Sequence, residues 1–158
     1  MKRMKANLWD LHSEAKVIPT NGVTKDAGGY PRIPQAVMGA GLAKQVASRW
    51  PALPILLGSR LEEYGNRVYV FTVPPHLREQ LKCLYIITFP TKHHWKDNGD
   101  MLLLQDSVTQ LYSISCALGL KSILLPFVGT GLARLDPLQV LTLLENNLDN
   151  SFTLVELP

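Results

Sequence analysis

Residues 36–47 read AVMGAGLAKQVA, a glycine turn followed at once by a helical pattern. Gly39 and Gly41 bracket one small residue, and Leu42 and Val46 repeat at the four-residue spacing of one helix face. A helix that begins at such a turn leaves its first backbone N–H groups unpaired, and the helix dipole adds partial positive charge there. The stretch therefore predicts an anion site, although one such turn alone can equally be a simple strand-to-helix connection.

A second glycine turn lies near the end of the chain. Residues 124–132 read LLPFVGTGL, in which an apolar strand pattern leads directly into Gly129, Thr130 and Gly131. Two strand-to-glycine-turn units in one small domain suggest a ligand whose diphosphate is held between them. We therefore expect the two turns to face the same ligand.

Length and composition indicate one globular domain over residues 1–158. Hydrophobic residues make up 46% of the chain and charged residues 18%, and the net charge of +3 is too small to require nucleic acid as a partner. Cys83 and Cys116 lack metal-ligand spacing and are expected to be buried free thiols. The absence of a leader-like or membrane-length apolar run makes a cytoplasmic protein the expectation, and we expect a monomer.

The rest of the chain alternates between strand and helix patterns. Strands are expected at 3–7, 16–19, 67–73, 84–89, 122–127 and 151–157, and helices after the first glycine turn, at 52–63, at 101–118 and after Asp136. Residues 23–34, rich in glycine, proline and charge, are expected to form a loop and are a candidate flap over a site. Without internal repeats, this alternation predicts an α/β fold, a three-layer α/β/α sandwich around a central mixed sheet.

Lys92 is the first candidate for chemistry. It follows a buried strand pattern and a proline, at the strand end where open α/β sheets bind their ligands. A lysine there could pair with a phosphate or, if desolvated, attack the anomeric carbon of a sugar. The alternative is an ordinary solvated loop lysine.

Other residues near the predicted strand ends each allow a functional and a structural interpretation. His93 and His94 are adjacent, so their side chains diverge and no third metal ligand is suitably spaced, which argues against a metal. One of the pair could still donate a hydrogen bond or act as an acid. Asn21 could bind ribose hydroxyls or simply form a turn. Asp136 reads first as a helix cap, and Phe127 could form the wall of a sugar site or close the core. Serine-hydrolase, P-loop and zinc-protease motifs are absent.

Several segments together resemble the macro domain, the ADP-ribose-binding fold. ANLWD at 6–10 resembles the family's opening strand and loop, AVMGAGLA its first ligand loop, and LPFVGTGLARLD its second. FPTKHHW at 89–95 and VMGAGLAKQ at 37–45 together are most similar to the branch that contains the DarG-type DNA ADP-ribosyl glycohydrolases and the terminal ADP-ribose glycohydrolase.

The resemblance implies roles for individual residues. Lys92 matches the catalytic lysine of that branch, with His94 and Asp136 as further catalytic candidates, and Asn21 would meet the distal ribose. The remaining ligand-binding positions that the resemblance implies are Asn7 and Leu8 beside adenine, Gly39, Ala40, Gly41 and Leu42 along the first phosphate wall, and Phe127, Gly129, Thr130, Gly131 and Leu132 along the second. No metal and no cofactor is implied.

Two departures from the family pattern affect these roles. Position 7 is asparagine where many macro domains carry an aspartate that grips adenine. Position 133 is alanine where the terminal glycohydrolase carries a catalytic aspartate, whereas Asp136 matches an aspartate of the DarG-type proteins.

The expected function is therefore an ADP-ribosyl hydrolase that removes ADP-ribose from a modified nucleobase or protein side chain. Two alternatives stay open: a non-catalytic reader of ADP-ribose, and a phosphatase or deacylase acting on ADP-ribose 1″-phosphate or an ADP-ribose ester. The expected partner is ADP-ribose or an ADP-ribosylated nucleic acid or protein, and no membrane is expected.

Overall fold

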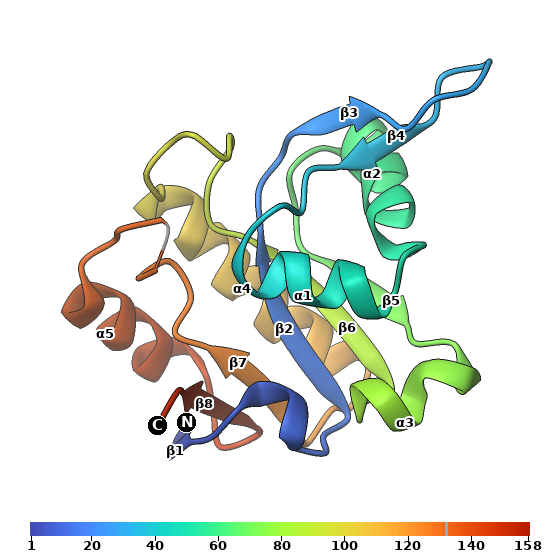
Figure 1. The fold of residues 1–158 in the computed structure, drawn as a ribbon. Coiled ribbons are helices and arrows are strands. Elements are labelled where there is room, and N and C mark those ends of the chain that lie inside the picture. The colour runs from blue at the N-terminus through green and yellow to red at the C-terminus, as the bar shows by residue number, and fades with distance from the viewer. Residues whose placement is uncertain (132) are drawn as a thin grey trace.

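The computed structural model describes residues 1–131 and 133–158, and in this part of the chain a six-stranded sheet lies between two layers of helices (Figure 1). Its strands are β1 (Lys2–Lys5), β2 (Ala15–Thr20), β5 (Tyr69–Thr72), β6 (Tyr85–Pro90), β7 (Ile123–Pro126) and β8 (Phe152–Glu156). They run in the order β1-β8-β7-β2-β6-β5, with every pair parallel except β5 with β6. The predicted mixed sheet and its strands are confirmed.

Helices of the described residues divide between the two faces of the sheet. They are α1 (Gly41–Arg49), α2 (Leu53–Tyr64), α3 (Arg78–Leu81), α4 (Met101–Ala117) and α5 (Pro137–Asn147), with 3-10 turns at Leu8–Asp10 and Pro75–Leu77. Apolar side chains of α1, α2 and α3 pack in one core cluster, and those of α4 and α5 pack in the other. The three-layer prediction is confirmed, while α3 and the 3-10 turns are too short to produce a periodic signal.

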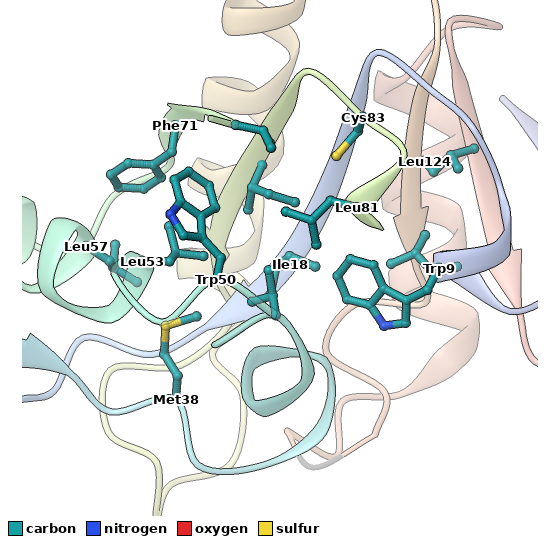
Figure 2. Close-up of a cluster of buried hydrophobic side chains, with 14 of the residues drawn as sticks. Trp9, Ile18, Met38, Trp50, Leu53, Leu57, Phe71, Leu81, Cys83 and Leu124 are labelled. Atoms are coloured by element: carbon teal, nitrogen blue, oxygen red, sulfur yellow. The ribbon is translucent and has the colours of Figure 1, made fainter. Parts of the chain in front are cut away.

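Side chains of the central strand β2 alternate between the two clusters. Val17 packs with the α4 and α5 side, whereas Ile18 packs with the α1 and α2 side, where Trp9 and Trp50 also lie (Figure 2). Lys16 points to the same face as Ile18 and is fully buried. A strand covered on both faces reads as a continuous apolar run, and Lys16 is the exception in it.

Strand register brings three loops to one edge of the sheet. Thr20 at the end of β2 pairs with Pro90 at the end of β6, and β7 runs parallel to β2 on its other side. The segments that follow these strands, beginning at Asn21, Thr91 and Phe127, therefore emerge together. This is the edge at which open parallel sheets bind ligands.

The segment 23–34 corrects a prediction. Instead of a loop it contains a two-stranded antiparallel hairpin, β3 (Thr24–Asp26) with β4 (Pro34–Ala36), which lies against α2 (Figure 1). A Cβ atom added at Gly58 of α2 would lie 2.6 Å from the carbonyl oxygen of Pro34, so the two elements touch backbone to backbone. The hairpin is thus a docked element and not a flap over the site.

The start of α5 at Asp136 agrees with the sequence, whereas the burial expected for Cys116 does not. Asp136 accepts a hydrogen bond from Leu138 N as the N-cap of α5, and Trp50 ends α1. Cys83 is buried as expected, but Cys116 is exposed, because it lies on the outer side of α4. Leu118, the last residue of the helix expected at 101–118, follows the end of α4 at Ala117 and is 46% exposed.

Candidate functional site

A cavity of about 860 Å³ opens at the carboxyl edge of the sheet. This volume lies within the range of small-molecule sites. Its lining includes these residues expected from the sequence: Asn21, Gly39, Ala40, Gly41, Leu42, Lys92, Phe127, Gly129 and Gly131. Both glycine turns thus border one cavity, as the diphosphate hypothesis requires.

The first wall of the cavity is the beginning of α1. Ala40 is the N-cap and provides no side-chain cap, and the first helical hydrogen bond runs from Lys44 N to Ala40 O at 3.2 Å. The N–H groups of Gly41, Leu42 and Ala43 precede this bond, and all three residues line the cavity. Gly41 has a φ of +57°, a left-handed conformation that glycine adopts without strain. Uncapped N–H groups and a helix dipole favour an anion here.

The second wall is the glycine turn after β7, which folds back on itself. Leu135 N donates to Gly129 O at 2.7 Å, Arg134 N donates to Gly131 O at 3.1 Å, and the Thr130 hydroxyl donates to Phe127 O at 2.8 Å. Gly129 has a φ of +78°, and a Cβ atom there would lie 2.8 Å from Cδ1 of Leu135. The left-handed φ favours glycine at this position, and a Cβ atom would also require the Leu135 side chain to move.

Asn21 lines the cavity, but its amide is largely occupied by the backbone. Oδ1 accepts from Val23 N at 2.9 Å, and Nδ2 donates to Val37 O at 3.1 Å. One N–H and one lone pair are left for a ligand. The amide therefore holds the turn between β2 and β3 in addition to facing the cavity.

Lys92 lies on the third side of the cavity, with its ammonium group donating to Trp95 O at 3.0 Å. Two N–H groups remain available to an anion. Trp95 is 49% exposed at the rim, and Lys96 lies over its ring at 5.1 Å from the centroid. His94 Nδ1 accepts from Lys96 N at 3.0 Å, which fixes the loop locally.

Other site residues expected from the sequence are not among the described residues that line the cavity. They are Asn7, Leu8, His94, Thr130 and Asp136, and Leu132 lies outside the described residues. Asn7 Oδ1 caps the 3-10 turn by accepting from Trp9 N, and Leu8 is buried in the core. Trp9 in turn donates from Nε1 to Gln45 Oε1 of α1 at 2.7 Å, so this segment is joined to the helix of the first wall.

Several lining residues are not among the ligand-binding residues expected from the sequence. Trp95 and Arg134 lie within the two quoted motifs FPTKHHW and LPFVGTGLARLD, and Lys96 directly follows the first of them. Arg134 has a φ of +57° where the second turn reverses. Lys92, Lys96 and Arg134 are basic, and they outnumber Asp97, the acidic residue among the described residues of the lining. This balance of charge favours an anionic ligand. Ala133 also lines the cavity and is 5% exposed.

An acidic side chain supports the Lys92 loop from behind. Asp100 caps α4 by accepting from the N–H groups of Leu103 and Leu102, and its other oxygen lies 3.3 Å from His93 Nε2. These backbone donors, led by Leu103 and aided by His93, hold the pKa of Asp100 below its usual value. Among the described residues, no group of three or more His, Cys, Asp or Glu side chains could hold a metal, and no helix could span a membrane.

Comparison with solved structures finds the same fold in several bacterial proteins. Thermosipho africanus DarTG in complex with ADP-ribose has a TM-score of 0.81 at 20% identity over 99% of this chain, which spans 41% of that protein. The macrodomain of Thermus aquaticus DarG has a TM-score of 0.77 at 24% identity, and that of Mycobacterium tuberculosis DarG 0.75 at 20%, each over 99% of this chain and 97% of the other. No curated protein matches the sequence.

A family match gives the assignment. The sequence model of the Macro domain matches residues 37–144, which include both glycine turns, the Lys92 loop and the strands β6 and β7. This stretch is more than half of the chain. The protein therefore belongs to the Macro domain family.

Proposed function

We propose that this protein binds ADP-ribose in the cavity and hydrolyses its bond to a modified nucleobase or protein side chain. The observation that carries the proposal is the meeting of both glycine turns and Lys92 around one cavity. The turns would hold the diphosphate, one at the α1 N-terminus and one after β7. The distal ribose would then lie between Asn21 and Lys92. A structural neighbour was solved in complex with ADP-ribose, which supports the same ligand here.

Lys92 has two chemical routes in this proposal. As a nucleophile, its neutral amine would bond to the distal C1″ while the bond to the target breaks and the target leaves with the electron pair. Water would then cleave the lysine adduct and release ADP-ribose. As a cation, it would instead stabilise negative charge while water attacks C1″.

Substitution of Lys92 separates these routes from simple binding. We expect Lys92→Ala to lower the release of ADP-ribose by about 100-fold or more while calorimetric binding of ADP-ribose changes by less than about 1 kcal/mol. Lys92→Arg keeps the charge but cannot lose its proton, so it retains activity only on the electrostatic route. Borohydride should trap an ADP-ribose adduct with the wild-type protein on the nucleophilic route, because the adduct can open to an imine.

The assay needs substrates of both classes and a matched control. An ADP-ribosylated oligonucleotide and an ADP-ribosylated protein would be compared, with Lys25→Ala as a control because Lys25 is exposed on the hairpin and outside the described lining. Full activity of Lys92→Ala would remove Lys92 from the mechanism.

A non-catalytic reader is the second candidate, and Ala133 is the observation that favours it. The resemblance places a catalytic aspartate of the terminal glycohydrolase at this position, and here a buried alanine lines the cavity instead. A reader would bind ADP-ribose tightly and release none from either substrate class. Calorimetry beside the release assay distinguishes the two functions.

A further inference from the structure

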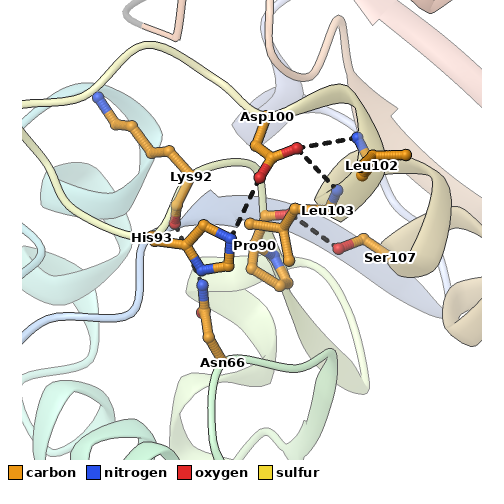
Figure 3. Close-up of polar contacts among 8 residues, drawn as sticks. All are labelled: Asn66, Pro90, Lys92, His93, Asp100, Leu102, Leu103 and Ser107. Atoms are coloured by element: carbon orange, nitrogen blue, oxygen red, sulfur yellow. Dashed lines mark hydrogen bonds and ion pairs between the residues drawn. The ribbon is translucent and has the colours of Figure 1, made fainter.

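Asn66 lies behind the cavity, in the connection between α2 and β5. Gly65 ends α2 with a φ of +92°, and the chain turns so that the Asn66 side chain reaches the Lys92 loop. Its Nδ2 donates to the carbonyl oxygen of Lys92 at 3.2 Å (Figure 3). The sequence offers no motif for this residue, since Gly65 and Asn66 read simply as a helix end.

Four consecutive carbonyl groups of the Lys92 loop are each held by a donor from another segment. Ser107 Oγ of α4 donates to Pro90 O at 2.8 Å, and Asp100 N donates to Thr91 O at 3.1 Å. Asn66 holds Lys92 O, and Gly22 N donates to His93 O at 3.0 Å. Figure 3 shows Asn66 on one side of this loop and Asp100 and Ser107 on the other. Among these donors, Asn66 is the side chain that donates a hydrogen bond to the backbone carbonyl of Lys92.

The amide of Asn66 also packs directly against the turn that carries Asn21. A Cβ atom added at Gly22 would lie 2.8 Å from Asn66 Cγ and 3.0 Å from Nδ2. A residue with a side chain at position 22 would therefore clash with the Asn66 amide. The same amide therefore touches the backbone next to Asn21 and the backbone of Lys92. It spans the ends of β2 and β6, which carry these two cavity residues.

The oxygen atom of the Asn66 amide makes this arrangement energetically unfavourable. Asn66 Oδ1 is buried and has no hydrogen-bond partner among the described residues. Rotating the amide would not relieve it, because Lys92 O requires a donor and would then face an oxygen. A buried polar atom left unpaired in this way calls for an explanation, and a functional constraint is one.

We propose that Asn66 is a positioning residue that sets where Lys92 stands relative to the two glycine turns. The inference rests on the proposed function, in which Lys92 acts on the distal ribose. Because reacting groups lose much of their advantage when displaced by about 1 Å, a shift of the Lys92 backbone reduces turnover without removing any group that binds the ligand.

Asn66→Asp tests this proposal, because it keeps the shape of the side chain and replaces the donating NH₂ with an oxygen. We expect kcat for ADP-ribose release to fall by between about 10-fold and 100-fold, with KM and ADP-ribose affinity within about 3-fold of wild type. Gly22→Ala leaves Asn66 unchanged but pushes on its amide, and it should shift kcat in the same direction.

Gln110→Ala is the matched control. Gln110 Oε1 accepts from Val68 N at 2.9 Å, so its removal also breaks a side-chain bond to the backbone near β5, but it does not touch the Lys92 loop. An unchanged kcat in Asn66→Asp would overturn the proposal. Equal losses of kcat and melting temperature in Asn66→Asp and Gln110→Ala would overturn it as well, because they would indicate a general structural role.

Crystal structures separate a failure of this proposal from a failure of the proposed function. If wild type releases no ADP-ribose from any substrate, the hydrolase function fails, whereas the role of Asn66 is still decided by comparing wild type with Asn66→Asp. Displacement of the Lys92 carbonyl and Nζ relative to the glycine turns supports positioning. Superimposable Lys92 atoms contradict it.

Discussion

Lys16 is a charged residue in the middle of the sheet, with no solvent-exposed surface. Its ammonium group donates to Leu81 O at 2.8 Å and lies 5.4 Å from the centre of the Trp9 ring. Burial lowers its pKa from 10.5 to about 8, with Cys83 and Asp10 acting in the opposite direction and Lys82 and Arg49 in the same one. One hydrogen bond and an aromatic face do not replace the lost water.

The pH dependence of stability should therefore carry a contribution from Lys16. Between about pH 8 and pH 10.5 the unfolded chain holds the proton and the folded chain has lost it, so the free energy of unfolding rises with pH, by at most about 3 kcal/mol. In Lys16→Met this rise should be absent. Urea titrations at a series of pH values measure the free energy of unfolding of both proteins.

The urea titrations need two controls, one for the neighbouring Cys83 and one for the loss of a lysine. Burial raises the pKa of Cys83 to about 11, which lowers stability as pH rises above 9, so the difference between wild type and Lys16→Met is the quantity to compare. Lys25→Met, at an exposed position, is the control for replacing a lysine with methionine. A difference that does not vary with pH would show that Lys16 is not desolvated as described.

At the scale of elements, the hairpin β3–β4 contradicts the loop that sequence patterns predicted at 23–34. Its strands are three residues each, too short for alternation to be visible among proline and glycine. Contacts with α2 hold it in place: Glu62 pairs with Arg32 and accepts from the Thr24 hydroxyl, and Gly58 lies against Gln35. Such tertiary contacts are invisible in a local pattern.

Gly58→Ala should destabilise the protein although alanine is the better helix former. Alanine normally gains about 1 kcal/mol over glycine in a helix. Here its Cβ would lie 2.6 Å to 2.8 Å from backbone atoms of Pro34, Gln35 and Ala36, so β4 must move, at a net cost of about 1–3 kcal/mol. Chemical denaturation measures the change, and Ser59→Ala, exposed on the same helix, should be nearly neutral. A more stable Gly58→Ala would contradict the tight docking of the hairpin.

At the scale of the whole molecule, the site depends on two backbone turns that are about ninety residues apart in the chain and border one cavity. Neither turn offers a complete site, since each presents only a few N–H groups. The proposed ligand has a phosphate for each side and a sugar at each end. Its affinity should therefore depend on contacting both turns at once.

Ligand stabilisation tests this dependence. ADP-ribose at about 100 times its dissociation constant should stabilise the fold by about 2.7 kcal/mol, seen as a raised melting temperature. AMP and ribose 5-phosphate, which each carry one phosphate and one sugar, should give much smaller shifts at the same concentration. Equal shifts for AMP and ADP-ribose would contradict a diphosphate held between the turns.

The sequence by itself determined the six strands of the main sheet, the long helices, the Asp136 cap and the two glycine turns, because periodicity, glycine and proline act over a few neighbouring residues. The alternation of strands and helices also indicated a mixed sheet and the strand ends at which Asn21 and Lys92 lie. Only the tertiary structure decided how Asn21 shares its amide with Val23 and Val37, and that Asn66 holds Lys92 O. These are contacts between residues distant in the chain, which depend on strand register and helix packing and leave no local pattern.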